Sequence, residues 1–357
     1  GNVTDDGHLD LSSVRHIAEK DFGKWTKRVT PRAGDIVFTY EATLNRYAII
    51  PEGFHGCLGR RMALIRPDTD KVDTRFLFYS FFGKEWRETI EANRQSGATV
   101  DRIPLIRFPN FPIVLPPLET QRRIASILGA YDDLIEVNRR RIAVLEEMAR
   151  GLFEEWFVRF RFPGHEAVPI LDTPDGPLPE GWTWGTLGDL LRLPYGKALK
   201  ANARRPGDVA VIGSSGVVGS HVEALVAGPG IVIGRKGNVG SVIWSATDFW
   251  PIDTTYYVDT RLPLHYVFQL LQRVTFENSH AAVPGLNRDY ALARVTMIVP
   301  DALVQRYGAL AKPLMDQVTT LERSNRSLAA SRDLLLPRLI SGQLSVAEAT
   351  RQLEEAA

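Results

Sequence analysis

Cysteine is nearly absent from this chain of 357 residues, in which Cys57 stands alone. One cysteine forms neither a disulfide framework nor a cysteine-based metal site. No apolar run approaches the ~20 residues that cross a membrane, and no signal peptide is visible at the start. These absences favour a cytoplasmic protein. The length is enough for two or three domains.

The motifs of several common enzyme classes are also missing. The sequence has no G-x-x-x-x-G-K-[ST] phosphate loop and no H-E-x-x-H pair. None of the nine lysines follows an acidic residue by two positions, so the acidic-x-Lys arm of metal-dependent nucleases is absent. The Pro116-Pro117 pair lacks the acidic or Asn residue and the aromatic residue of adenine methyltransferases. We therefore expect a chain that is not an enzyme and holds no metal or cofactor.

Charge of one sign is not in excess, because 43 basic and 42 acidic residues leave a net charge of +1. No global basic field therefore indicates nucleic acid. Local loops can still carry the electrostatic footprint of a nucleic-acid interface.

A heptad pattern is present between two strand-like halves of the chain. Its apolar seam repeats by fours and threes, which predicts a long helix that packs along another helix. The alternative is a helix that lies on a domain core. The seam positions are Ile124, Leu128, Tyr131, Ile135, Asn138, Ile142, Leu145, Ala149, Leu152 and Trp156.

A second stretch repeats the first near the end of the chain. When Pro116 is placed on Pro300, an offset of 184 residues, Gln121 falls on Gln305 and Gly129 on Pro313. Each copy is predicted to be a strand ending in proline, a short helix, a break and a long helix. The two copies indicate an internal duplication.

The second seam predicts the register of the helix pair. It consists of Leu314, Val318, Leu321, Asn325, Leu328 and Leu335. Polar residues on an apolar seam set register, so Asn138 is predicted to face Asn325. The same antiparallel register pairs Ile135 with Leu328, Ile142 with Leu321, Leu145 with Val318 and Ala149 with Leu314.

Proline and glycine punctuation divides the chain into segments. Strand-like runs bounded by turn residues predict two β-rich domains, in which Ile231–Ile233 corresponds to Ile36–Phe38 and a helix over 264–273 corresponds to one over 73–90. The first domain is expected to lack an N-terminal piece. The predicted segments are domain 1 over 1–116, a central helical region over 117–162, a linker over 163–178, domain 2 over 179–300, a distal helical region over 301–345 and a tail over 346–357.

Three loops in domain 2 have the chemistry of nucleic-acid contacts. The first follows a buried-looking strand and is flanked by glycines, which permit close backbone approach, while Arg, Lys and Asn suit phosphates and base edges. The alternative is a basic hairpin turn on a solvated face. The candidates are Arg235, Lys236 and Asn238 in the first loop, Ser214 and Ser215 in the second, and Lys197, Lys200, Arg204 and Arg205 in the third.

Domain 1 has fewer candidates. Asn45 and Arg46 occupy the place that corresponds to the 234–240 loop. Arg102 and Arg288 lie in comparable loops before the last strands, where structural salt bridges are the alternative.

These motifs resemble the specificity (S) subunit of type I restriction-modification systems. The resemblance rests on LPPLETQ (115–121) with Ile124 and Leu128, and on GSSGVVG (213–219), GRKGNVG (234–240) and WPID (250–253). It implies an α+β fold with two β-rich target-recognition domains, each reading half of a split DNA site. Two long helices packed as an antiparallel coiled coil would separate these domains as a spacer and docking site.

The resemblance also implies partners. They are double-stranded DNA, two modification (methyltransferase) subunits and, through these, restriction (translocase-nuclease) subunits. The partner subunits are expected to use S-adenosylmethionine, ATP and Mg. The expected partner interface and coil residues are Gln121, Ile124, Leu128, Ile135, Asn138, Ile142, Leu145, Leu314, Val318, Leu321, Asn325 and Leu328. The alternatives are the specificity subunit of another restriction or defence system with a fused nuclease-methyltransferase, and a coiled-coil adaptor without a DNA role.

Overall fold

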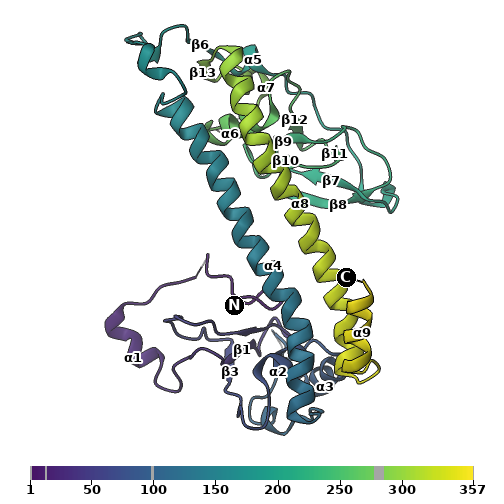
Figure 1. Cartoon of the computed structure of the whole chain (residues 1–357). Helices are drawn as coiled ribbons and strands as arrows, with labels where there is room; N and C mark the ends of the chain where they lie inside the picture. Colours follow the sequence, from purple (N-terminus) through teal and green to yellow (C-terminus); the bar gives the residue numbers. More distant parts are fainter. Residues whose placement is uncertain (1, 13, 98–99, 277–284, 357) are drawn as a thin grey trace. The chain divides into compact units, whose positions relative to one another are not determined.

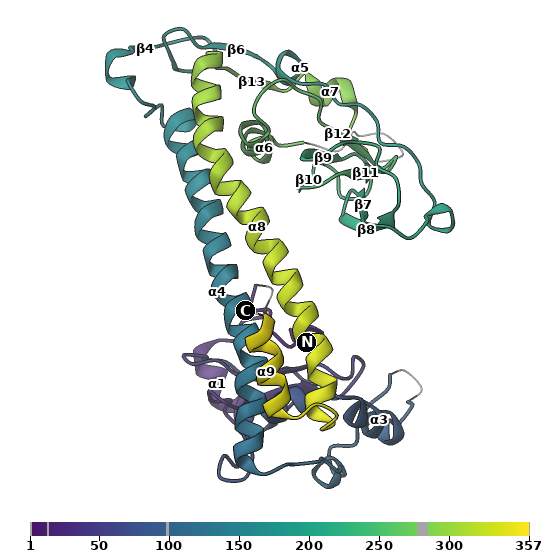
Figure 2. The same ribbon diagram turned by 45° about the vertical axis from the view of Figure 1, so that its right-hand side comes forward.

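Two units make up the computed structural model, which describes residues 2–12, 14–97, 100–276 and 285–356. Unit 1 is Gly1–Val137 with Ser324–Ala357, and unit 2 is Asn138–Arg323. Each unit combines a small antiparallel sheet with helices and takes one half of each of the two longest helices (Figures 1 and 2). The predicted α+β class is confirmed.

Unit 1 is built on a three-stranded sheet of order β2-β1-β3, antiparallel throughout. Ile36 and Phe38 of β1 are buried against Phe76 and Trp86 of the helices that cover one face. The elements are β1 (Ile36–Thr39), β2 (Tyr47–Ile49), β3 (Met62–Ile65), α1 (Phe22–Trp25), α2 (Thr74–Ser80), α3 (Lys84–Asn93) and α9 (Val346–Ala356), with short 3-10 turns at Glu19–Asp21 and Phe108–Asn110.

The structure corrects one predicted helix of unit 1. The single helix predicted over 73–90 is two helices, because the chain turns at Phe81–Gly83 and so brings Phe81 into the core beside Trp86, with ring centroids 4.8 Å apart. The segment predicted as a tail contains α9. The Ser345 hydroxyl accepts a hydrogen bond from the Glu348 amide at its start, as an N-cap does, and Ala349 is buried in the core of unit 1.

Unit 2 repeats the three-stranded sheet with the order β10-β9-β12 and adds further strands. Helix α6 (Leu264–Arg273) packs behind this sheet, as α2 and α3 do in unit 1. The strands are β9 (Gly230–Gly234), β10 (Val242–Ser245), β12 (Thr255–Tyr257), β7 (Val209–Gly213), β8 (Gly216–His221), β11 (Phe249–Pro251), β6 (Thr183–Thr186), β13 (Val295–Ile298), β4 (Ile170–Leu171) and β5 (Leu178–Pro179). The remaining helical elements are α5 (Leu187–Leu190), α7 (Arg288–Leu292) and 3-10 turns at His165–Ala167 and Ala201–Ala203.

The predicted correspondence between the two sheets is confirmed. Strands β1 and β9 are both the central strand of their sheet. Ile36 and Phe38 face the core of unit 1, and Ile231 and Ile233 face the core of unit 2. Alternate residues of a strand point to opposite faces, so the two strands present the same face to their helices.

The longest helices are α4 (Leu118–Phe153), which continues into a π-helical turn at Glu154–Val158, and α8 (Asp301–Ile340). In unit 2, Leu145 and Ala149 of α4 share one hydrophobic cluster with Met315 and Val318 of α8. In unit 1, Asp132 of α4 pairs with Arg332 of α8. The late half of one helix therefore meets the early half of the other, which confirms the antiparallel coil.

The predicted breaks at Gly129 and Pro313 were wrong, because both helices run through these positions. Gly129 permits a close approach instead, since a Cβ there would lie 2.5 Å from Nη1 of Arg75. Pro313 lies on the exposed side of α8, as does Ala309 four residues earlier. The carbonyl that proline leaves without a helical partner is therefore open to water.

The structure also corrects the offset between the two helices. Leu118 and Asp301 begin α4 and α8, which is an offset of 183 rather than 184. The buried positions agree with this value, because Ile124 and Leu128 correspond to Tyr307 and Ala311. The strand predicted before the first helix is also missing, since residues 111–117, all of them described, form none.

The predicted register is supported within unit 2. Leu145 and Val318, and likewise Ala149 and Leu314, lie in one cluster, as the register requires. Asn138 is buried. Its pairing with Asn325 stays a prediction.

Candidate nucleic-acid interface

Each unit has a hairpin loop that follows the central strand of its sheet. We call residues 39–46 loop 1 and residues 234–241 loop 2. Both loops have eight residues between the last paired positions of their strands. The Thr39 amide donates to the Arg46 carbonyl at 3.0 Å, and the Gly234 amide donates to the Ser241 carbonyl at 2.8 Å. The two loops are therefore closed by the same hydrogen bond.

The backbone turns of the two loops also coincide. The fourth residue has a left-handed backbone in both, with φ of 68° at Ala42 and 79° at Gly237. The seventh does so too, with φ of 60° at Asn45 and 77° at Gly240. Glycine reaches this region without strain, and Asn does so more readily than other residues with a Cβ.

A distant segment holds the second residue of each loop. The Ile103 amide donates to the Tyr40 carbonyl at 2.8 Å, and the Leu286 amide donates to the Arg235 carbonyl at 2.8 Å. The neighbouring strand adds another bond, since the amides of Tyr40 and Arg235 donate to the carbonyls of Arg61 and Thr254 at 3.2 and 2.9 Å. These shared bonds make Tyr40 and Arg235 equivalent positions.

The side chains of Tyr40 and Arg235 also bond alike. The Tyr40 hydroxyl donates to the Arg60 carbonyl, and Nη1 of Arg235 donates to the Asp253 carbonyl, both at 3.0 Å. Each bond uses only part of the side chain's capacity, because a guanidinium has five N–H donors and a phenol also accepts. Each loop thus presents a polar side chain in a defined orientation.

Loop 2 gathers positive charge around an aromatic ring. The guanidinium carbons of Arg235 and Arg288 lie 5.1 and 5.3 Å from the ring centroid of Tyr195. Lys236 and Asn238 are exposed in the same loop. The structure therefore brings together Arg235 and Arg288. These two arginines had been placed in different loops by the sequence analysis.

Ser214 holds loop 2 through two hydrogen bonds. It is buried, its carbonyl accepts from the Ser241 hydroxyl at 2.6 Å, and its own hydroxyl accepts from the Asn238 amide at 3.4 Å. Ser215, the next residue, is exposed. Of the two predicted serines, Ser214 thus stabilises the loop by hydrogen bonds, and Ser215 is exposed to solvent.

The remaining predicted basic residues of unit 2 differ in whether their side chains already bind other parts of the unit. Nη1 of Arg204 donates to the Val218 carbonyl at 2.6 Å, and Arg205 forms an ion pair with Glu223. These two arginines stabilise the unit's own loops. Lys197 and Lys200 are exposed, and the Lys197 ammonium lies 6.0 Å from the ring centroid of Trp250.

The predicted residues of unit 1 are placed differently from those of unit 2. Arg46 donates from Nη1 to the Val3 carbonyl at 3.1 Å, and the Asn45 side chain accepts from the Tyr47 hydroxyl at 3.3 Å. Arg102 is exposed and pairs through its backbone with Gln95. It immediately precedes Ile103, whereas Arg288 follows Leu286 by two residues, so Arg102 and Arg288 are not equivalent.

Two residues were missed by the sequence analysis, Tyr40 and Tyr195. Tyr40 is the loop 1 equivalent of Arg235 but follows directly on β1, where it is indistinguishable from a strand residue in the pattern. Tyr195 had one signal, the adjacent Gly196. A Cβ at Gly196 would collide with the backbone carbonyl of Ile252, so this segment lies close to the neighbouring chain.

Gln121 is also placed unexpectedly. It is buried at 1% exposure, its Oε1 accepts from the Asp73 amide at 3.0 Å, and its Nε2 donates to the Pro116 carbonyl at 2.8 Å. This residue therefore joins the start of α4 to the start of α2 inside unit 1. Its counterpart in α8 at the corrected offset is Val304, which is buried as well.

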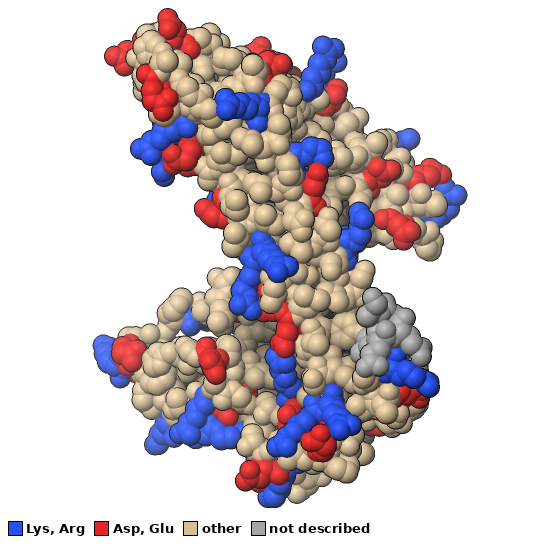
Figure 3. Space-filling model, in the orientation of Figure 1, with Lys and Arg blue, Asp and Glu red and all other residues tan. Residues whose placement is uncertain are grey.

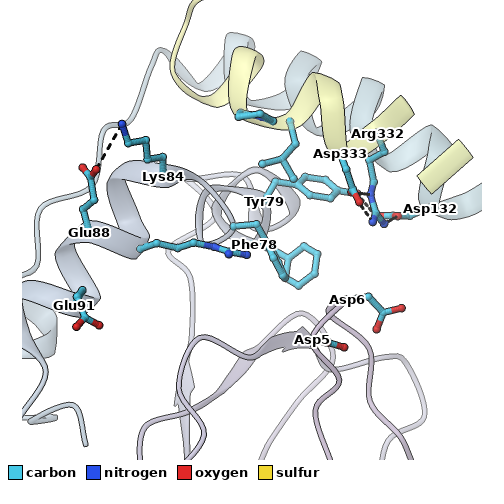
Figure 4. A pocket seen from close by; sticks show the side chains of 14 residues that line it. Asp5, Asp6, Phe78, Tyr79, Lys84, Glu88, Glu91, Asp132, Arg332 and Asp333 are labelled. Atoms are coloured by element: carbon cyan, nitrogen blue, oxygen red, sulfur yellow. Dashed lines mark hydrogen bonds and ion pairs between the residues drawn. The ribbon is translucent and has the colours of Figure 1, made fainter. Parts of the chain in front are cut away.

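A pocket of about 960 Å³ lies in unit 1 (Figure 4). Beside it the Tyr79 hydroxyl donates to Asp132 at 2.5 Å, and Arg332 pairs with Asp132 and Asp333. Burial and the Asp132 carboxylate raise the pKa of Tyr79, so this phenol stays protonated as a donor. The network ties α2, α4 and α8 together.

Acidic and basic side chains are interspersed on the face shown in Figure 3. In the described part of the chain, no helix is long and apolar enough to cross a membrane. The same residues contain no group of three or more His, Cys, Asp or Glu arranged to hold a metal ion.

Comparisons with known proteins connect this geometry to a family. Residues 6–147 match the family model described as the type I restriction modification DNA specificity domain. The type I restriction enzyme MjaIX specificity subunit of Methanocaldococcus jannaschii is 24% identical over 365 residues, covering 94% of this chain and 83% of that protein. The HindI specificity subunit of Haemophilus influenzae is 28% identical over 157 residues, covering 43% of this chain and 33% of that protein.

The chain resembles a type I specificity subunit. A solved S subunit of a type I restriction-modification system from M. genitalium shares the fold, with a TM-score of 0.56 and 16% identity over 88% of this chain and 84% of that one. The resemblance inferred from the sequence is confirmed. The predicted fold is confirmed as well, since that S subunit shares it.

Proposed function

We propose that this chain is the sequence-specific DNA-recognition subunit of a type I restriction-modification system. The observation that carries the proposal is the repeated hairpin loop. One backbone design, closed by the same hydrogen bonds, presents Tyr40 in unit 1 and Arg235 in unit 2. A repeated scaffold with different donors suits a protein that reads two unlike halves of one DNA site.

The chemistry of the loops supports this reading. A guanidinium forms bidentate hydrogen bonds with guanine O6 and N7, or with phosphate oxygens. Asn238 has the donor and acceptor pair that suits adenine. Exposed Lys236 adds a point charge for the DNA backbone. Residues that read bases and residues that contact phosphates are thus available in one loop.

The proposal extends to partners that supply the chemical reactions. This chain would hold no cofactor and perform no catalysis, while modification subunits methylate DNA with S-adenosylmethionine and restriction subunits use ATP and Mg. The two long helices would dock the modification subunits, of which we propose two. Exposed apolar residues on α4 support a docking role, since Leu134, Val144 and Met148 face solvent in the chain alone.

A test of the proposal compares DNA methylation with DNA binding. The chain is expressed with its modification subunits in a host without other methylation, and the modified sites are mapped by sequencing. A split target with two specified halves is expected. The complex should then bind a labelled duplex of that target about 1,000-fold more tightly than a scrambled duplex at the same salt concentration. A complex without preference for any duplex would contradict the proposal.

A further inference from the structure

Tyr195 lies at the centre of the positive charge in unit 2. Its ring is within 5.3 Å of two guanidiniums that are far apart in sequence, those of Arg235 and Arg288. Tyr195 is 49% exposed, so this cluster reaches the surface. The segment is held from behind, since the ring centroids of Tyr195 and Tyr256 are 5.0 Å apart and the Gly196 amide donates to the Thr255 carbonyl at 3.0 Å.

Tyr256 connects this arrangement to the segment just before helix α7, which begins at Arg288. Its hydroxyl donates to the Leu286 carbonyl at 2.9 Å, and the Leu286 amide donates to the Arg235 carbonyl at 2.8 Å. Burial, together with neighbouring Tyr195, raises the pKa of Tyr256 to about 12. The phenol is therefore a permanent donor at neutral pH. The Arg235 backbone and the Tyr195 ring are thus held on one framework with Leu286, which lies two residues before Arg288.

We propose that Tyr195 is a positioning residue that holds Arg235 and Arg288 together as one two-guanidinium site for DNA acceptor atoms. Two like charges near one ring repel each other, and the ring offsets this through its negative face. Neutralisation of Arg288 is incomplete, because its ion pair with Asp289 is long, at 3.6 Å, and the Asp289 side chain is 87% exposed. The site therefore favours an anionic or electron-rich ligand with adjacent acceptor atoms.

Two groups on DNA have this chemistry. Guanine offers O6 and N7 on its major-groove edge, and a phosphate offers two oxygens. A guanidinium stacked on a ring is restricted in its rotation, so less conformational entropy is lost when it binds. This inference rests on the proposed DNA-recognition function and identifies the residues that orient the donors in unit 2.

The main test uses Tyr195→Leu and Tyr195→Phe in the complex with modification subunits. The probes are a labelled duplex of the wild-type target and methylation mapping in cells. Leucine removes the ring and should weaken binding about tenfold, whereas phenylalanine keeps the ring and should bind like the wild type. If the arginines read guanine, Tyr195→Leu should relax the same base positions as Arg235→Ala. If they meet phosphate, binding should weaken equally on all sequences, with a smaller salt dependence.

A matched control is available in the same unit. Arg294, two residues beyond the end of helix α7, lies 5.5 Å from the ring centroid of Tyr290 in that helix, a similar pair that is not in the proposed site. Tyr290→Leu should therefore leave the methylation pattern and the affinity unchanged. Thermal unfolding of each variant separates a loss of folding from a loss of binding.

A double-mutant cycle distinguishes positioning from direct contact. In an Arg235→Ala, Arg288→Ala background, Tyr195→Leu should have no further effect, because the groups that it positions are gone. A further loss there would mean that Tyr195 contacts DNA itself and would overturn the inference. If Tyr195→Leu does not fold, the Arg235→Ala and Arg288→Ala pair still decides. Their losses should be strongly non-additive, and independent losses would overturn the single-site proposal.

The failure of this inference is distinguishable from failure of the proposed function. A wild-type complex that methylates a split target, together with a Tyr195→Leu variant of unchanged affinity and pattern, would refute the positioning role alone. A wild-type complex without sequence preference would refute DNA recognition itself.

Discussion

Loop 1 and loop 2 have the same closing hydrogen bonds and the same left-handed positions, but almost none of their side chains are alike. Tyr40 occupies the place of Arg235, and Glu41 follows it where loop 2 has Lys236. Unit 1 therefore presents a neutral phenol and a carboxylate, whereas unit 2 presents two cations. The comparison teaches that the hydrogen bonds maintaining the loop involve the backbone, so the exposed side chains are free to differ. Two loops with unlike exposed side chains then result from one repeated fold.

The units also differ where the long helices meet. In unit 1, the partly buried Asp132 and Arg332 pair within the seam, next to Tyr79. In unit 2, the seam is apolar around Ala149, Met315 and Val318. Mutation and pH change the stability of charged contacts differently from that of apolar contacts.

The largest expected effect is in the charged seam. Arg332→Ala should destabilise unit 1 by about 2–3 kcal/mol, because it leaves the Asp132 carboxylate partly buried without its cation. Lys312→Ala in unit 2 is the matched control. Its ion pair with Asp316 is exposed, so about 0–0.5 kcal/mol is expected. Hydrogen exchange at amides of α8 on either side of Arg323 measures both. Equal losses would show that the Asp132–Arg332 pair contributes no more than an exposed ion pair.

A smaller effect is expected at the start of the central strands. Asp35 of unit 1 is buried and accepts from Nε and Nη2 of Arg66 at 2.8 and 2.7 Å, whereas unit 2 has Gly230 at this position. Burial opposes ionisation, but the hydrogen bonds from Arg66 and from the Arg32 amide, together with the charges of both arginines, outweigh it and lower the pKa of Asp35. Its stabilisation is therefore present above the ordinary carboxyl pKa and is lost as pH falls through the lowered value.

Acid should therefore loosen β1 before β9. Protection factors of β1 amides should fall below about pH 4, while those of β9 change less. Asp35→Asn should cost about 1–2 kcal/mol at neutral pH and should remove the difference in pH dependence. If β1 and β9 respond alike in the wild type, Asp35 is not the origin of the asymmetry.

The smallest effect concerns the left-handed position that the loops share. Ala42→Gly should stabilise loop 1 by up to about 1 kcal/mol, because alanine is strained at φ of 68°. Gly237→Ala should destabilise loop 2 by a similar amount, since glycine has φ of 79° there. Denaturant unfolding of the two variants measures the sign of each change in the free energy of unfolding. The same sign in both would show that the loops do not share this turn.

The sequence predicted those parts of the fold that are local or periodic. The seam from Ile124 to Trp156 was found because burial repeats along a helix. The offset was one residue wrong because it placed Pro116 on Pro300, whereas the carbonyls that accept from the Gln121 and Val304 amides belong to Pro117 and Pro300. The break at Pro313 was wrong because an exposed carbonyl tolerates the loss of its helical partner.

The interface was predicted less well than the helices. Arg235 and Lys236 could be predicted as candidates because glycines mark loop 2, but Tyr40 was not predicted because loop 1 has Ala42 and Asn45 in the same turns. The bond from Ile103 to Tyr40 that reveals the equivalence joins residues far apart in sequence. The Tyr195 cluster likewise forms only when three separate segments meet.

On the proposed function, each unit reads one half of a split DNA site through its hairpin loop. The most direct test is methylation mapping of Tyr40→Ala and Arg235→Ala, each in the complex with modification subunits. We expect Tyr40→Ala to relax one half of the target and Arg235→Ala the other, each with a loss of about 1–3 kcal/mol in affinity. Relaxation of the same half by both variants, or an unchanged target in both, would contradict the account.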